Sequence, residues 1–441
     1  MTQYRVDTHE FWGTNKTIYE VVMLADQYGN RVSSGNPSGM AVDGFGRART
    51  STPLTLFDSS HRFSDNDLWA TSNSASGNST VTFAANQGLI QLAVTNAANA
   101  EIIRETKRVF SYQPGKSIQT LNTFVMNAAQ TNLRQRVGYF GDQNGIYLEL
   151  DNSILYLVKR YYNLGSVQEE RVAQSSWNVD KLDGLGPSKI TLDISAPQIF
   201  FMDVEWLGVG SVRCGFIVDG LLIHCHSFHH ANKAGGNSTY MTTATLPLRY
   251  EIKNTGTTAN SSILKQICST VISEGGYELR GEQHSINTPI ATPRDLTTAN
   301  TYYPVIALRL ANTALDAAAV LSGLSLVGVG NNGYFHWKIV TGCTIIEPSP
   351  DTGWQNAANS DIMQYKLDGV GIDDGKVLLS GFTSSTTQGV AVIDVPRDSL
   401  FKFQFERNTF TANASVLALV VASKVAGDDM YASMDWEEIS R

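Results

Sequence analysis

Residues 212–228 read VRCGFIVDGLLIHCHSF, and this stretch decides the fold class of the chain. Two apolar runs flank Asp219-Gly220, a dipeptide that suits the type I′ turn of a two-residue hairpin because both positions tolerate a positive φ. With that turn, Val218 pairs with Leu221 and Cys214 lies opposite Cys225. One face is then expected to be a core face: Val212, Cys214, Phe216, Val218, Leu221, Ile223 and Cys225. The opposite face carries Arg213, Gly215, Ile217, Leu222, His224, His226 and Phe228.

Short strand-like runs recur on both sides of this hairpin, separated by turns rich in Gly, Asn and Asp. Regular spacing of this kind is typical of β-sandwiches and jelly rolls. No window shows a sustained helical period with caps, so we expect far more strand than helix. The sequence therefore predicts an all-β chain: an extended arm over 1–66, a jelly-roll-like β-sandwich over 67–280 and a second β-sandwich over 281–441.

Residues 33–65 of the predicted arm include few apolar residues, and between 33 and 43 these are only Met40, Ala41 and Val42. Such a segment buries too little surface to offset the entropy of ordering it, so we expect the arm to order against a partner chain. A string of anchors runs through residues 45–58, and its two arginines can make charge-assisted hydrogen bonds to a neighbour. The predicted anchors are Phe45, Arg47, Arg49, Leu54, Leu56, Phe57 and Asp58.

Composition narrows the classes of function. The chain has 441 residues, of which 42% are apolar and 17% charged, and a formal net charge of −8. Phosphate binding requires a basic surface, so nucleic acid is not an expected partner. Runs of like charge and apolar windows are both short, so a membrane partner is not expected either. The four cysteines form no CxxC and no secretory signal is visible, which predicts free thiols and synthesis in a reducing cytosol.

Several short sequence segments show a resemblance to a known family. They include FGRAR at 45–49, TLFDS at 55–59, RVGYF at 136–140, GIYLE at 145–149 and EWLGVG at 205–210. Together they resemble the virion structural proteins of tailed bacteriophages, marine ones in particular. The resemblance implies a non-enzymatic capsid-decoration, fibre or tail component, made in the bacterial cytoplasm and located in the virion. It also implies other virion proteins as partners, and we expect a homo-oligomer, trimer or larger, without cofactors.

Two carboxylates stand at alternate positions of one predicted strand, Asp203 and Glu205. The strand is similar to the E-x-D-x-E strand of jelly-roll β-glucanases, which implies an electrostatic helper at Asp203 and the acid/base at Glu205. The nucleophile position, however, holds Phe201. Retaining hydrolysis requires two carboxyl groups flanking the scissile bond. We therefore expect no catalytic residues here and predict that Glu205 pairs with Arg213; a polysaccharide hydrolase is the weakest alternative.

Half of the eight histidines cluster in residues 224–230. His224 and His226 share a predicted face, as two strand-borne metal ligands would, and Asp203 or Glu205 across the sheet could supply a third ligand. A polar or glycan-contacting face is the preferred interpretation, and no metal is predicted. The alternative function is accordingly a glycan-binding receptor protein for host-surface glycan. Its candidate contacts are Trp206, Tyr156 and the face of Asp203, Glu205, Arg213, His224 and His226.

Overall fold

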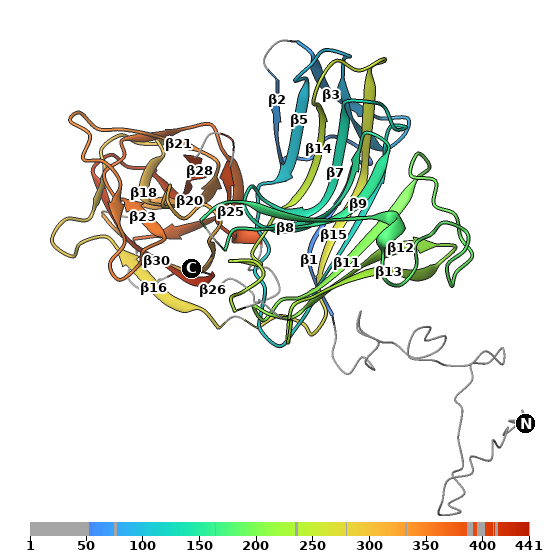
Figure 1. Cartoon of the computed structure of the whole chain (residues 1–441). Helices are drawn as coiled ribbons and strands as arrows, with labels where there is room; N and C mark the ends of the chain where they lie inside the picture. Colours follow the sequence, from blue (N-terminus) through green and yellow to red (C-terminus); the bar gives the residue numbers. More distant parts are fainter. Residues whose placement is uncertain are drawn as a thin grey trace, which may run out of the picture.

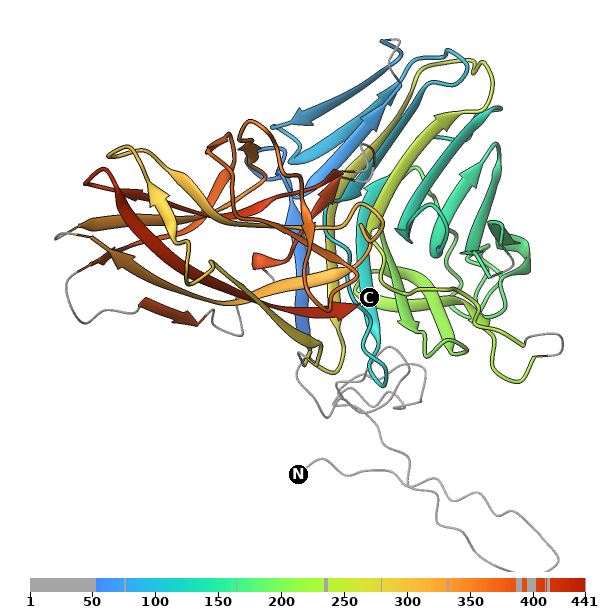
Figure 2. The same cartoon turned by 90° about the vertical axis from the view of Figure 1, so that its left-hand side faces the viewer.

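A computed structural model describes residues 53–74, 77–163, 165–233, 237–278, 280–330, 333–385, 391–394, 402–408, 410 and 413–440. Strands make up 55% of the residues that the structure describes, and those residues contain no α-helix, only short 3-10 turns such as η1 (Gln174–Ser176). The all-β class and the β-sandwich architecture are therefore confirmed. Figures 1 and 2 show two strand-built bodies side by side, one blue to yellow-green and the other yellow to red.

Two antiparallel sheets form the first sandwich. The eight-stranded sheet has the order β13 (Leu221–His229), β12 (Ser211–Val218), β11 (Gln198–Glu205), β6 (Ile118–Val125), β15 (Ser262–Ser273), β4 (Leu89–Val94) and β3 (Ser79–Ala84), with β1 (Leu54–Ser60) paired to β15. The seven-stranded sheet has the order β10 (Gln168–Ala173), β9 (Ile154–Tyr161), β8 (Gly145–Asp151), β7 (Leu133–Phe140), β14 (Leu248–Asn254), β5 (Glu101–Thr106) and β2 (Trp69–Asn73).

The second sandwich is built the same way from later strands. One sheet contains β16 (Glu282–Asn287), β30 (Asp428–Ser440), β19 (Ala318–Val329) and β26 (Ala391–Asp394), with β17 (Arg294–Leu296) on β30. The other has the order β22 (Gln355–Asn356), β23 (Met363–Lys366), β18 (Tyr303–Leu310), β29 (Leu417–Ser423), β20 (Tyr334–Thr341) and β25 (Lys376–Ser384). Two small ladders join β21 (Thr344–Ile346) to β24 (Gly371–Asp373) and β27 (Arg407–Asn408) to β28 (Asn413–Ala414).

Each sandwich has its own hydrophobic core. Alternate residues of the first pair of sheets form one cluster, drawn from residues between 56 and 271. A second cluster is drawn from residues between 296 and 436, and it includes the fully buried Trp436. Strands that bury one face in a core and leave the other outside follow the two-residue period read from the sequence.

Strand β1 corrects the predicted arm. Residues 54–60 pair with residues 268–273 of β15, while β4 takes the other part of the same edge, residues 262–266. A bulge at Leu56 lets Leu56 and Phe57 both be buried in the first core. The arm predicted for residues 1–66 is therefore wrong for residues 54–60, because β15 supplies a ladder and a core that the segment does not contain. Phe45, Arg47 and Arg49 lie outside the described residues.

The hairpin of residues 212–228 is confirmed at its turn and corrected at its far end. Asp219 and Gly220 have φ of 51° and 77°, and Val218 pairs with Leu221. Beyond Gly215 and its partner His224 the register shifts, so Cys214 lies opposite His226 and Cys225 is the extra, bulged residue. The Cys225 carbonyl accepts the N–H groups of residues 179 and 180, at 3.0 and 3.1 Å, which holds the bulge. The thiols of Cys214 and Cys225 are free and buried, as predicted.

Candidate functional site: a charged sheet face

The structure separates the members of the polar face predicted from the sequence. Asp203 on β11 lies opposite Arg213 on β12, and Arg213 lies opposite Ser227 on β13, so these positions share one face of the eight-stranded sheet. Asp203 is fully buried there. Glu205 lies opposite Ser211 on the ladder, and its pairing with Arg213 stays a prediction.

His224 and His226 do not share a face, because the bulge at Cys225 separates them. His224 Nε2 lies 2.9 Å from Ser227 Oγ, and burial lowers the pKa of His224. His226 Nδ1 accepts the backbone N–H of Asn178 at 3.2 Å, its ring packs edge-on against Phe228, and burial lowers its pKa to about 4. Both rings therefore serve internal contacts. Within the described ranges, no three His, Cys, Asp or Glu side chains gather into a group that could hold a metal ion.

Phe201, at the position of the glucanase nucleophile, is a packing residue. It is buried, and its ring lies over Gly215, where an added Cβ would come within 2.6 Å of the ring. The side chain therefore fills the space that the missing Cβ leaves.

The densest array of charge lies elsewhere, on the outer face of the seven-stranded sheet. Alternate residues of β7, β8, β9, β10 and β14 place cations and carboxylates in rows across the strands. We call this set the charged lattice: Arg134, Arg136, Glu149, Asp151, Arg160, Glu169, Arg171 and Glu251. Its four arginines balance its four carboxylates, so the lattice as a whole is neutral.

Every carboxylate of the lattice accepts from arginine. Arg136 donates to Glu149 at 2.6 Å and to Glu251 at 3.3 Å, and Arg134 donates to Glu251 at 2.9 Å. Toward the edge of the sheet, Arg160 pairs with Glu169 at 2.8 Å and Arg171 pairs with Asp151 at 2.7 Å. Arg171 also reaches Glu149, which is fully buried.

These contacts determine the protonation of the lattice. Burial alone would raise the pKa of Glu251, but Arg136 and Arg134 outweigh burial and lower it. The same balance lowers the pKa of Glu169, where hydrogen bonds from Tyr147 and Arg160 oppose burial. Both carboxylates are therefore ionised at neutral pH, which fits charge-assisted hydrogen bonding and does not fit a general acid.

Aromatic rings complete the lattice. The Tyr147 ring lies 5.1 Å from the Arg136 guanidinium and 5.2 Å from that of Arg160, and its hydroxyl donates to Glu169 at 2.7 Å. Tyr156 lies under Arg171 at 4.2 Å. Stacked and paired arginines lose the freedom of their side chains, so this part of the sheet is a rigid surface.

The other end of the same sheet face is covered by the second sandwich. Glu105 of β5 accepts from Arg249 at 2.8 Å and from Arg407, across the junction, at 2.9 Å. The outer ends of these arginines reach Asp142 at 2.8 Å and Asp316 at 3.0 Å. Glu105, Arg249 and Arg407 are at most 3% exposed, so the junction is a buried ionic contact.

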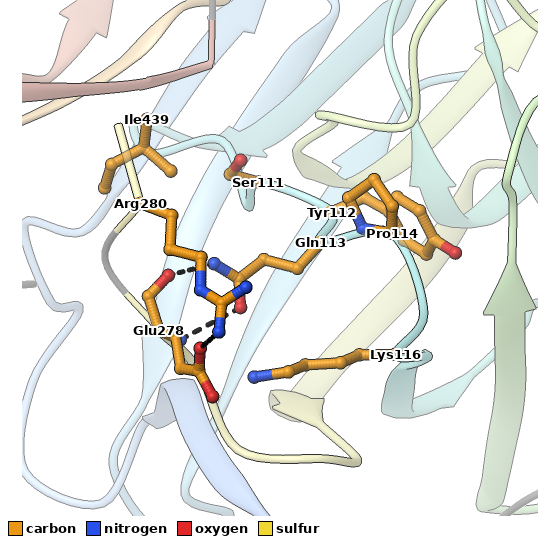
Figure 3. A pocket seen from close by; sticks show the side chains of 8 residues that line it. All are labelled: Ser111, Tyr112, Gln113, Pro114, Lys116, Glu278, Arg280 and Ile439. Carbon is orange, nitrogen blue, oxygen red and sulfur yellow. Dashed lines mark hydrogen bonds and ion pairs between the residues drawn. The ribbon is translucent and has the colours of Figure 1, made fainter. Parts of the chain in front are cut away.

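A hollow of about 370 Å³ lies where the chain passes from one sandwich to the other (Figure 3). The Gln113 side chain bonds both the N–H and the carbonyl of Glu278, as a neighbouring strand would. Arg280 pairs with Glu278, and Lys116 points into the hollow beside them (Figure 3). The polar contacts fix the connecting segment against the loop at 111–116, and so help to orient the two sandwiches.

Sequence reasoning missed the charged lattice and the junction. A signal was present: charged residues at alternate positions, as in Arg134 and Arg136, Glu149 and Asp151, or Arg249 and Glu251. It could not be used because β14 joins β7 to β5 only through a long-range ladder, so the rows do not exist in any local stretch.

Comparisons with known proteins identify no family. No family model matches the chain, and no curated protein matches it in sequence. Among solved structures, the chain is similar to the CBM2 module of the evolved Dit of Lactobacillus casei phage J-1, with 8% identity, 51% of this chain and 98% of that chain covered, and a TM-score of 0.32. It is similar to a carbohydrate esterase of Shiga toxin-encoding bacteriophage phi24B, with 13% identity, coverages of 50% and 99%, and a TM-score of 0.30.

A third similarity is to arcelin-5, a lectin-like defense protein of Phaseolus vulgaris, with 10% identity, coverages of 51% and 99%, and a TM-score of 0.30. Similarities at these scores carry no inference about what this chain does. None of the described segments forms a helix long and apolar enough to cross a membrane.

Proposed function

We propose that this chain is a non-enzymatic structural protein of a tailed-bacteriophage virion, attached to other virion proteins by the residues that precede β1. The observation that supports the proposal is the pairing of β1 with β15, which begins a few residues after the predicted arginine anchors. Arg49 lies five residues before Leu54, so the chain length limits the separation of their Cα atoms to about 17 Å. An attachment made at Phe45, Arg47 and Arg49 would therefore pull directly on a strand hydrogen-bonded to the centre of the eight-stranded sheet.

The contacts at the junction of the two sandwiches support a structural role. Buried ion pairs between Glu105, Arg249 and Arg407 couple the two sandwiches, and Arg108 adds a bond to Glu406 at 2.8 Å. A part of a particle must hold its shape against its neighbours, and contacts of this kind resist hinge motion. We also propose that many copies pack together as a homo-oligomer, trimer or larger.

The carboxylates support a non-enzymatic role. Glycoside hydrolysis needs one carboxyl group that stays protonated near neutral pH and a second that is free to attack or to activate water. Glu251 and Glu169 have lowered pKa values and arginine partners instead. At β11 the nucleophile position is taken by the buried Phe201.

Two truncations test the attachment. Deleting residues 1–52 leaves β1 in place, so we expect a folded protein of unchanged melting temperature that fails to enter phage particles when it complements a null phage. Deleting residues 1–66 also removes β1 and exposes the edge of β15 with Leu56 and Phe57 gone, so this variant should melt earlier. Full-length protein with Arg47→Ala and Arg49→Ala tests the two arginine anchors separately from the rest of the deleted segment. Normal incorporation of the 1–52 deletion would overturn the proposal.

A glycan contact at Asp203, His224 and His226 is not favoured. Asp203 is fully buried, and both imidazoles are engaged with neighbouring protein groups. A different part of the molecule has the features that a sugar site requires.

A further inference from the structure

A pocket of about 380 Å³ opens on the second sandwich, within the range of small-ligand sites. Its walls come from three places: the segment from the end of β16 through β17, the start of β18, and the loop between β23 and β24. Residues distant in sequence thus meet around one cavity. The polar side chains that line the pocket and enter the argument below are Thr292, Arg294, Asp295, Thr297, Tyr303 and Asp368.

Arg294 is the positive group of this pocket. Its guanidinium lies over the Tyr303 ring at 5.4 Å, and its Nη2 donates to the carbonyl of Gly369. An arginine has five N–H donors, and that bond is the one hydrogen bond that Arg294 makes with its side chain to the residues described by the structure. No carboxylate within those ranges forms an ion pair with it. The stack fixes the guanidinium in place while most of its donors stay unused.

Carboxylates lie beside this arginine. Asp295 and Asp368 both line the pocket, and Asp295 is exposed. Asp295 stands directly opposite Asp429 on β30, and burial together with the charges of Asp295 and Asp428 raises the pKa of Asp429. Like charges at facing positions of a ladder are unfavourable. Asp368 pairs with Lys366 at 3.4 Å, whereas Asp295 forms no ion pair within the described residues, so the charge of Asp295 disfavours an anionic ligand there.

The remaining lining is amphipathic. Thr292 and Thr297 contribute hydroxyl groups, and the Tyr303 hydroxyl is held at 2.8 Å from Thr297 Oγ1. Pro289, Pro293, Leu367 and Val370 supply aliphatic surface. A sugar ring presents the matching chemistry, since its hydroxyls can both accept from a guanidinium and donate to carboxylates while its C–H groups pack on apolar atoms.

We infer that this pocket binds a neutral saccharide, with Arg294 donating to ring hydroxyls, Asp295 accepting from them, and the apolar walls contacting the C–H face. The inference goes beyond the structural role proposed above and does not depend on it. A virion protein with such a site would contact neutral glycan of a host surface at a place remote from its attachment strand.

Ligand-observed saturation-transfer NMR on the full-length chain tests this inference. The probes are methyl α-D-glucopyranoside, methyl α-D-galactopyranoside and methyl α-D-mannopyranoside, each titrated to tens of millimolar, with N-acetylneuraminic acid as the anionic comparison. We expect saturable transfer to at least one neutral probe and weaker transfer to the anionic one. Asp295→Asn should weaken binding about tenfold, the change expected for losing one hydrogen bond to a charged group.

Asp295→Asn relieves the repulsion with Asp429, so it should fold normally, and an unchanged melting temperature will confirm this. Arg294→Lys keeps the charge but loses the stacked fork, and it should also weaken binding. Lys116→Gln, in the hollow at the junction, is the matched control and should bind as the unaltered protein does, as should the 1–52 deletion. The inference is overturned if no neutral probe binds, if N-acetylneuraminic acid binds as well as they do, or if Asp295→Asn changes nothing.

Discussion

Two carboxylates on one sheet face, Glu105 and Glu149, have the same immediate chemistry but different surroundings. Each is fully buried, and each accepts from two arginines. Glu149 on β8 joins β7 and β10 of a single sheet, and one of its arginines, Arg171, is 34% exposed. Glu105 joins two sandwiches, and its arginines, Arg249 and Arg407, are at most 3% exposed.

The difference shows that the stability lost when an ion pair is broken depends on the partners that the remaining charged groups keep. Without Glu149, Arg136 keeps the buried Glu251 and Arg171 keeps Asp151. Without Glu105, Arg249 and Arg407 retain Asp142 and Asp316, which are 75% and 66% exposed and so screened by water. Removing one partner of a buried ion pair strongly destabilises the folded state when the other partner stays buried and unpaired.

The largest effect is therefore expected from Glu105→Gln, which keeps the shape and removes the charge. We expect a loss of about 3–5 kcal/mol in the free energy of unfolding, together with faster proteolysis near the junction. Urea denaturation and limited proteolysis would measure the two effects. An unchanged urea midpoint would contradict the view that this carboxylate couples the sandwiches.

Glu149→Gln is the matched variant within one sheet. Because Glu251 and Asp151 remain as partners, we expect a smaller loss, about 1–3 kcal/mol, without increased proteolysis at the junction. The same urea titration compares the two variants directly. A loss equal to or above that of Glu105→Gln would break the comparison.

The pH dependence separates the ionic networks from the buried histidines. The pKa values of His61 and His226 are lowered to about 4, chiefly by burial, from 6.5 in the unfolded chain. The unfolded state therefore takes up protons first, and stability falls as pH drops from about 6.5 to 4, by up to about 3 kcal/mol per histidine. The lowered pKa of Glu251 instead contributes stability above about pH 4.5 that is lost only at lower pH.

Melting temperatures measured between pH 7 and pH 4 would test this order of events. His226→Gln should flatten the upper part of the profile, while His229→Gln, at an exposed position, should leave the profile as it is. A profile that is flat down to pH 4.5 in the unaltered protein would show that the histidines do not contribute.

The smallest effect is expected at the hairpin turn, which touches neither network. Gly220 has a φ of 77°, and nothing lies within 4 Å of an added Cβ, so Gly220→Val meets conformational strain without a clash. We expect a loss of about 1–2 kcal/mol, and less for Gly220→Asn because asparagine tolerates this region. Thermal unfolding would measure both, and equal stability of the valine variant would refute the turn assignment.

Local sequence patterns were enough to predict the fold class. The alternation around Asp219-Gly220 predicted the hairpin, its turn and the burial of Cys214 and Phe216, because side-chain period and turn chemistry are properties of a few consecutive residues. The opposite faces taken by His224 and His226 could not be read in the same way. They depend on a bulge that is held by the backbone at residues 179 and 180, more than forty residues away.

The sequence by itself determined that this is an all-β chain with alternating strands and free thiols in its core. Tertiary structure alone decided that residues 54–60 are a strand, since their ladder partner is β15, and that Glu105, Arg249 and Arg407 meet at a junction. The physical reason is range: period and turn preference act over a few bonds. Pairing partners, bulges and buried charge rows are set by which distant strands come to lie side by side.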